Sequence, residues 1–221
     1  MLQPIMHVLN AQRIILASGS PRRKHILENV GLKFEVIPST FEEKLDKSKF
    51  PSPVEYVLET ASQKTLQVAE MLKTKSSLVP DLVIGADTVV SMDGKIFEKP
   101  KDKDDAFQML SGFSGGSHTV YTGVVLITPS NVFQTGAGES VNSMRIHKFH
   151  EATDVSMATL TPEIVRAYIE TGEPMDKAGG YGIQAIGGTL VEKVNGDFFN
   201  VMGFPLCRFA QELLNLYSQK K

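Results

Sequence analysis

One short segment combines hydroxyl and guanidinium groups at a point where a strand is expected to give way to a helix. Residues 18–23 read Ser-Gly-Ser-Pro-Arg-Arg. Ser20 is a good N-cap residue, and Pro21 suits the first position of a helix. A helix N-terminus offers free amide donors and a positive dipole end. The segment therefore predicts a phosphate-binding site. The alternative interpretation is an ordinary capped helix whose arginines are exposed to solvent.

Two charged side chains stand where apolar ones are expected. Lys64 lies on the apolar stripe of a helix predicted to begin at Pro53, and an ammonium is seldom buried without a partner. Asp87 follows the apolar run of residues 82–86, and open α/β sheets bind ligands beyond the carboxyl ends of their strands. Lys64 could instead extend its apolar stem to solvent, and Asp87 could cap a turn.

A tight turn places a second lysine near Asp87. The dipeptide Asp93-Gly94 is typical of a two-residue hairpin. A hairpin centred there would place Thr88 opposite Lys99, and Lys99 would then lie beside Asp87. An acid and a lysine next to a cluster of arginines exceed what capping a turn requires, so this register favours a functional site.

Acidic residues elsewhere could complete the site. Glu42 and Glu43 follow the second expected strand and could join Asp87 as metal ligands. Hydroxyls, arginines, two lysines and carboxylates at several strand ends suit phosphoryl chemistry. In that chemistry the protein positions phosphates and neutralises their charge, while a carboxylate orients water or holds Mg²⁺.

The elements that must position these residues alternate between strands and helices. The third strand is expected to be interrupted at Asp87 and Thr88, a loop to cover residues 128–140, and Asn195-Gly196 to form a last hairpin. Because the alternation has no linker or repeat, residues 1–221 are predicted to form a single α/β domain with a mixed sheet. Strands are expected at 14–17, 34–37, 82–90, 119–127 and up to about 157, and helices at 21–30 and 102–112 and from 53, 162 and 206.

The composition excludes several classes of protein. The 221 residues include 23 Lys and Arg against 25 Asp and Glu, and this net charge of −2 lacks the basic surface that duplex nucleic acid demands. Cys207 is the single cysteine, so no intrachain disulfide can form, which favours a reducing compartment. No apolar run approaches the roughly 18 residues of a membrane span. We therefore expect a cytoplasmic protein with neither a membrane nor a stable nucleic-acid partner.

Three other motifs fit known sites less well. Residues 180–185 match the glycine pattern of dinucleotide-binding folds, but they neither follow a clear strand nor open a helix. Residues 112–116 match the nucleophile-elbow pattern but follow a helix where a strand is required, which leaves a serine hydrolase built on Ser114 as a weaker hypothesis. His147 and His150 would point to opposite faces of a strand, so zinc is not supported.

With these segments assembled, the chain resembles the Maf-like nucleoside triphosphate pyrophosphatases. The resemblance runs from about residue 13 to 218. It implies an α/β fold like that of the inosine triphosphatase group, with an elongated mixed β-sheet flanked by helices, and it implies a homodimer. The matching segments are residues 16–23, 31–43, 85–88, 98–100, 176–184 and 203–206, together with Lys64.

The resemblance also implies a reaction and its residues. A nucleoside triphosphate would be hydrolysed between the α and β phosphates, giving a monophosphate and pyrophosphate, with a divalent cation such as Mg²⁺ or Mn²⁺. Asp87 would be the proton acceptor that activates water, and Glu43 would lie with Asp87 near the metal. The implied phosphate-binding and catalytic cations are Arg22, Arg23, Lys64 and Lys99, and the implied hydroxyls are those of Ser18 and Ser20.

Within the family, Arg22, Thr88 and Gln184 resemble the subgroup that prefers dTTP and UTP, with an extension to modified pyrimidine nucleotides. A sister subgroup acting on 7-methyl-GTP has Trp at the position of Arg22 and Gln at that of Thr88. The amide of Gln184 presents both a donor and an acceptor to a base edge, and its alternative is a buried amide bonded to backbone. The alternative function is a nucleotide-binding regulatory protein with little turnover, because the family has been linked with arrest of cell division.

Overall fold

One mixed sheet runs through the part of the chain that the structure, a computed structural model, describes: residues 1–75, 79–129, 139–141 and 144–218. Its strand order is β2-β1-β3-β5-β7-β6, with β4 paired to β3 and β8 to β7. β1 runs parallel to β2 and β3, whereas the other pairs are antiparallel. The strands are β1 (Ile14–Leu16), β2 (Glu35–Val36), β3 (Leu82–Met92), β4 (Lys95–Phe97), β5 (Ser117–Pro129), β6 (Glu139–Val141), β7 (Met144–Met157) and β8 (Val191–Asn195).

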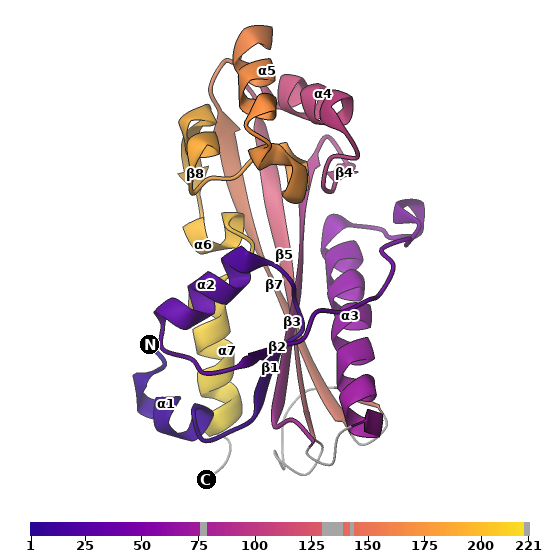
Figure 1. Cartoon of the computed structure of the whole chain (residues 1–221), viewed down its shortest axis with the longest axis vertical. Coiled ribbons are helices and arrows are strands. Elements are labelled where there is room, and N and C mark those ends of the chain that lie inside the picture. Colours follow the sequence, from indigo (N-terminus) through magenta and orange to yellow (C-terminus); the bar gives the residue numbers. More distant parts are fainter. Residues whose placement is uncertain (76–78, 130–138, 142–143, 219–221) are drawn as a thin grey trace.

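Helices cover both faces of this sheet, so the predicted elongated α/β architecture is confirmed (Figure 1). α3 covers one face, α1, α2 and α7 pack on the other, and α4 and α5 lie at the far end of the long strands. No helix within the described ranges is both long and apolar enough to cross a membrane. The helices are α1 (Gln3–Leu9), α2 (Pro21–Asn29), α3 (Pro53–Lys75), α4 (Lys103–Phe113), α5 (Pro162–Glu170), α6 (Phe198–Val201) and α7 (Leu206–Ser218), with short 3₁₀ turns η1 (Lys47–Lys49), η2 (Glu173–Asp176), η3 (Ala178–Gly180) and η4 (Ile186–Leu190).

The helix boundaries follow local chemistry. α2 begins at Pro21 and is followed by Gly31, whose φ of 82° suits glycine. At the start of α3, the Ser52 hydroxyl donates to the Glu55 carboxylate (3.0 Å) and accepts from the Glu55 amide (3.4 Å). Asp102 likewise accepts from an amide at the start of α4. The predicted starts of these helices are confirmed to within a residue.

The expected interruption of the third strand is wrong. β3 is continuous from Leu82 to Met92, because β5 pairs with it along most of its length, with Asp87 opposite Gly123. On the other edge of β3, β1 pairs only as far as Ile84, and β4 pairs only from Val90 onward. Among the described residues, no strand pairs with this edge of residues 85–89. The gap therefore lies beside β3, and Asp87 lies at the middle of it.

The alternation of β3 sends neighbouring side chains to opposite faces. Val83 and Val89 pack with α3, whereas Ile84 and Ala86 pack in the core under α2 and α7. Asp87 consequently faces α3, and Thr88 faces α2. Because the sheet is open along this edge, groups from both faces can meet in the gap.

Two turn predictions have different outcomes. The Asp93-Gly94 turn is confirmed, since both residues have positive φ and Val90 pairs with Phe97. The ladder ends at Phe97, so the expected pairing of Thr88 with Lys99 does not form. The hairpin expected at Asn195-Gly196 is wrong, because β8 pairs with β7 and residues 196–197 lead into α6.

Other differences lie near the ends of the strands. The N-terminal residues form α1, which was not predicted and which buries Leu2 and Leu9 in the core beside α7. Most of the loop expected at 128–140 lies outside the described residues. Thr128 and Pro129 extend β5, and Glu139 and Ser140 belong to β6.

We expect Gly85→Ala to lower the free energy of unfolding by about 1–3 kcal/mol, the usual cost of overpacking a core. A Cβ atom at Gly85 would lie 1.8 Å from Oγ1 of Thr65, which is fully buried on α3. Gly112→Ala in α4 is the control, because its Cβ would meet nothing within 4 Å; helix propensity should make it neutral or stabilising by up to about 1 kcal/mol. Urea denaturation followed by circular dichroism checks both, and equal stability of the two variants would contradict this close packing.

Candidate active site

A cavity of about 390 Å³ occupies the gap beside β3. Among the elements that supply its lining residues are α2, α3, η2 and η3, and α2 and α3 can be followed in Figure 1. Its walls come from both faces of the sheet, as the alternation of β3 requires. The charged and hydroxyl side chains that line it are those of Ser18, Ser20, Arg22, Arg23, Ser39, Glu43, Lys64, Asp87, Thr88, Glu98, Lys99, Asp176, Lys177 and Tyr181.

The ammonium of Lys64 connects two carboxylates at the α3 side of the cavity. Its Nζ lies 2.7 Å from Oδ1 of Asp87 and 2.8 Å from Oε1 of Glu43. The Lys64 side chain is 14% exposed and that of Asp87 is 9% exposed, whereas Glu43 is 41% exposed. The partners of Lys64 are thus Asp87 and Glu43, and its ammonium does not extend to solvent, the alternative weighed from the sequence.

Burial shapes the proton affinity of Asp87. Loss of hydration raises the pKa of the Asp87 carboxyl above its usual range, while the nearby charges of Lys64 and Arg23 oppose that rise. A carboxylate whose pKa is raised binds a proton more readily than an exposed aspartate. Such a group can accept a proton from water in the cavity.

Arg23 spans the gap and bonds to protein acceptors on several segments. Its guanidinium donates to the carbonyl oxygens of Ala86 (2.8 Å) and Gly203 (2.9 Å) and to the hydroxyls of Ser18 (3.0 Å) and Thr88 (3.0 Å). These bonds join α2 to the segment after β1, to β3 and to the turn before α7. Arg23 therefore holds the cavity wall together, and its positive charge still faces the cavity.

The start of α2 presents polar groups to the same space. Ser18 is buried, and its hydroxyl also accepts from the Ser20 amide (3.3 Å). Ser20 occupies the N-cap position, but its side chain makes no capping hydrogen bond. The first amides of the helix and the Ser20 hydroxyl therefore border the cavity, an arrangement suited to an anion.

Asp176 and Lys177 were not predicted as site residues. Asp176 accepts from Nη1 of Arg22 (2.8 Å) through its carboxylate and from Nη2 (3.0 Å) through its carbonyl, and the Lys177 ammonium lies 2.7 Å from the same carboxylate. Arg22 and Asp176 are 154 residues apart in the chain, so no local pattern could pair them. The available signal was that Asp176 and Lys177 both lie in the segment 176–184, which resembles the Maf-like family.

Lys99 and Gln184 lie in different surroundings. Lys99 is exposed and lines the cavity, but the pairing with Thr88 that was expected to place it beside Asp87 does not form. Gln184 is exposed and lies outside the cavity lining, next to Ile183, which lines it. The alternative of a buried Gln184 amide is therefore wrong.

A divalent cation fits the donors present. Asp87 and Glu43 both approach one ammonium, which shows that a cation can contact both carboxylates at once. Mg²⁺ is commonly held by one or two carboxylates together with substrate phosphates. Within the described ranges no group of three or more His, Cys, Asp or Glu residues could hold a metal alone. A cation here would thus take its remaining ligands from water or substrate.

The competing motifs have structural explanations. The Ser114 hydroxyl donates to the carbonyl of Leu160 (3.2 Å) and accepts from its amide (2.7 Å), which ties the end of α4 to the chain after β7. Ser114 does not line the cavity. His147 bonds to Glu212 on α7 (2.8 Å), whereas His150 is exposed. A serine hydrolase centre at Ser114 and a zinc site at these histidines therefore find no support.

Comparison with known proteins agrees with this geometry. The family model described as "Maf-like protein" matches residues 13–216. The human "Probable bifunctional dTTP/UTP pyrophosphatase/methyltransferase protein" is 51% identical over 216 residues, which are 98% of this chain and 34% of that protein. The chain thus spans about a third of the human relative.

Bacterial relatives match along nearly their whole length. A "dTTP/UTP pyrophosphatase" of Clostridium perfringens (strain SM101 / Type A) is 42% identical, with 92% of this chain and 96% of the relative covered. One of Agathobacter rectalis is 44% identical, with 92% and 97% covered. All residues that line the cavity lie within the range matched by the family model, and the chain belongs to the Maf family.

Proposed function

We propose that this chain hydrolyses dTTP and UTP to the nucleoside monophosphate and pyrophosphate. The observation that carries the proposal is the Lys64 ammonium held between Asp87 and Glu43 in a cavity that α2 opens onto. The names of relatives at 42–51% identity support the same activity. Modified pyrimidine nucleotides are proposed as further substrates.

The triphosphate would bind across the gap. The first amides of α2 and the hydroxyls of Ser18 and Ser20 would donate to phosphate oxygens. Arg22, Lys64 and Lys99 would neutralise the charge of the phosphates. Arg23, which is bonded within the cavity wall, would stabilise the phosphates through its positive charge without direct contact. Arg22 and Lys177 now contact Asp176, so phosphates would compete with that carboxylate for the same cations.

Asp87 would accept the proton of the attacking water. The water oxygen forms a bond to the α-phosphorus, the bond from that phosphorus to the α–β bridging oxygen breaks, and the bridging oxygen leaves with pyrophosphate. The raised pKa of Asp87 matches this role better than that of an exposed aspartate would. Lys64, at 2.7 Å, would hold the carboxylate in position and keep it ionised.

Glu43 and Asp87 would hold the divalent cation, Mg²⁺ or Mn²⁺. Such a cation neutralises the charge that develops on phosphate oxygens and orients the triphosphate. Glu43 would exchange its contact with Lys64 for one with the cation, whereas Asp87 would keep Oδ1 on Lys64 and offer its other oxygen to the cation. The exchange at Glu43 would free one side of the ammonium for the substrate.

Base selectivity is proposed to depend on Arg22, Thr88 and Gln184. Thr88 bonds to Arg23 and to Thr122 and so helps to shape the floor of the cavity. Gln184 follows Ile183, which lines the cavity, and its amide would meet a pyrimidine edge that reaches beyond Ile183. A second copy of this chain is the proposed partner, and the cytoplasm is the proposed compartment.

A panel of dTTP, UTP, CTP, GTP, ATP and 7-methyl-GTP tests the activity through pyrophosphate release. We expect turnover with Mg²⁺ or Mn²⁺, led by dTTP and UTP, and its loss when a chelator removes the metal. Turnover led by another base would contradict the proposed selectivity. Nucleotide binding without turnover would contradict the enzyme and support a regulatory nucleotide-binding protein.

Asp87→Asn should reduce kcat for UTP by about 10²–10⁴-fold, the usual contribution of a general base. The amide keeps an oxygen that can accept from Lys64, so folding and UTP binding should be retained. Asp154→Asn is the control, because this exposed carboxylate on β7 lies outside the cavity lining. Steady-state kinetics with calorimetric UTP binding checks the variant, and near-normal kcat would exclude Asp87 as the base.

Lys64→Met should move the acid limb of the pH profile of kcat/KM to higher pH. The ammonium lowers the pKa of Asp87 against the effect of burial, so its removal lets that pKa rise, and the base becomes protonated at a higher pH. Lys24→Met, which removes an exposed lysine on α2 outside the cavity lining, is the control. An equal loss of activity at every pH would contradict this effect of Lys64 on Asp87.

A further inference from the structure

Glu98 lines the cavity and joins three segments of the chain. Its Oε1 accepts from the hydroxyl of Tyr56 (2.6 Å), and its Oε2 lies 2.7 Å from Nζ of Lys47. Its backbone carbonyl accepts from the amide of Gly179 (3.0 Å). One residue after β4 is thus bonded to α3, to η1 and to η3.

Residues of the proposed chemistry lie on or near α3, η1 and Glu98 itself. Tyr56 is buried on α3, two helical turns before Lys64. Lys47 follows Glu43 by four residues, and Lys99 is the neighbour of Glu98. The position of Glu98 therefore affects the segments that carry the Glu43 carboxylate and the Lys64 and Lys99 side chains.

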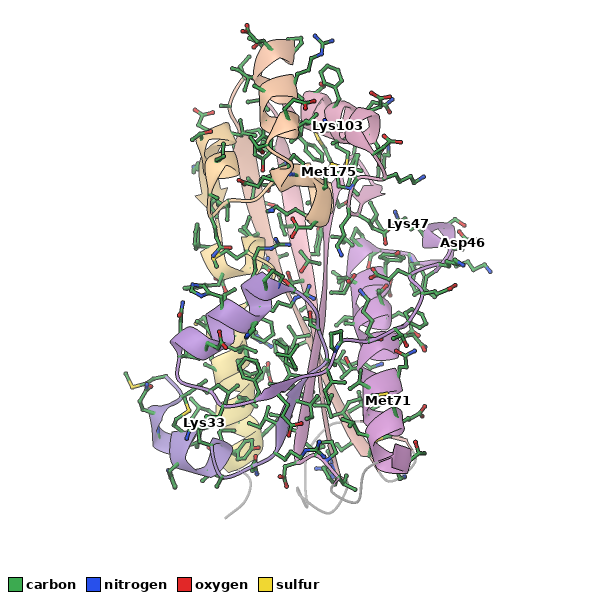
Figure 2. All side chains as sticks on the ribbon, in the orientation of Figure 1. Lys33, Asp46, Lys47, Met71, Lys103 and Met175 are labelled. Carbon is green, nitrogen blue, oxygen red and sulfur yellow. The ribbon has the colours of Figure 1, made fainter. Side chains whose placement is uncertain are left out.

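Residues 39–47 form the segment that carries Glu43, and side-chain contacts tie this segment to the rest of the molecule at three points. Near its start, Gln67 on α3 accepts from the Ser39 hydroxyl (2.5 Å) and the Thr40 amide (2.9 Å). In its middle, Glu43 contacts Lys64. Near its end, Lys47 contacts Glu98 and the carbonyl of Ile96 (3.4 Å). Figure 2 shows Lys47 beside the exposed turn at Asp46.

A bound cation would remove the middle tie. Glu43 cannot give the same oxygen to Lys64 and fully to a metal, so the ties at the two ends would then set where the carboxylate lies. Each oxygen of Glu98 has a partner on a different segment, Tyr56 on α3 and Lys47 in η1, so the carboxylate connects these two segments. Its geometry suits an indirect role.

We propose that Glu98 is a positioning residue: together with Lys47 and Tyr56 it holds the segment of Glu43 against the cavity when a divalent cation is bound. The inference rests on the proposed function, because it takes Glu43 as a metal ligand. Residues that orient metal ligands commonly change metal affinity or activity by about 10–100-fold when altered.

The test compares Lys47→Met, Glu98→Gln and Tyr56→Phe with the unaltered protein. We expect Mn²⁺ binding, measured by the electron paramagnetic resonance signal of free Mn²⁺, to weaken about 10-fold in Lys47→Met and Glu98→Gln. The Mg²⁺ concentration for half-maximal turnover should rise by the same factor, while kcat at saturating Mg²⁺ changes by less than about twofold. Tyr56→Phe removes one hydrogen bond and should change both quantities less. Lys47→Arg should restore them, because it keeps the charge.

Glu170→Gln is the matched control. It removes the Lys103–Glu170 ion pair, which has the same 2.7 Å distance but joins α4 to α5, and Figure 2 shows Lys103 at the α4 end of the molecule, apart from Lys47. Hydrogen exchange of residues 42–50 gives a readout that needs no turnover, and we expect faster exchange in Lys47→Met than in Glu170→Gln.

The outcomes separate this inference from the proposed function. If the unaltered protein releases no pyrophosphate from any nucleotide, the proposed function fails. If it turns over but Lys47→Met and Glu98→Gln keep its Mn²⁺ affinity and its exchange rates, Glu98 has no positioning role. A fall in kcat at saturating Mg²⁺ with unchanged Mn²⁺ affinity would also overturn the inference.

Discussion

The arrangement depends on one buried ammonium. Removing a lysine and an aspartate from water is costly, and their attraction repays that cost only with close geometry and further partners. Lys64 meets this condition through Asp87 and Glu43. The same contact leaves two carboxylates facing a cavity with their charge only partly neutralised. Burial then raises the pKa of Asp87. The loss of hydration that makes burying the pair costly in free energy thus also gives the aspartate the proton affinity of a base.

The sheet makes room for this contact by leaving one edge of β3 unpaired. β1 ends at Leu16, which pairs with Ile84, and β4 ends at Phe97, which pairs with Val90. Between these two pairs the edge of β3 is open, and side chains from both faces of the sheet reach the gap. Asp87 turns toward α3, and Thr88 turns toward α2, where Arg23 bonds to four acceptors around the opening. A ligand in the gap can therefore contact an acid and a lysine from one face and the amide donors of a helix N-terminus from the other.

Features set by a few neighbouring residues could be predicted from the sequence. The capping box at Ser52 and the Asp93-Gly94 turn depend on short-range hydrogen bonds, and the apolar stripe of α3 singled out Lys64 as an anomaly. Asp87 was expected to break its strand because a charged residue is costly in a sheet interior; a lysine 23 residues away offsets that cost. The contacts of Arg22 with Asp176 and of Lys47 with Glu98 depend on tertiary packing, so no local pattern could reveal them.

A crystal structure of the Asp87→Asn variant with UTP and Mg²⁺ would test the central claim most directly. The account predicts the triphosphate at the start of α2, the cation in contact with Glu43, and the Lys64 ammonium turned toward phosphate. A nucleotide bound outside the gap beside β3, or one bound there with Glu43 still on Lys64 and no cation nearby, would contradict it.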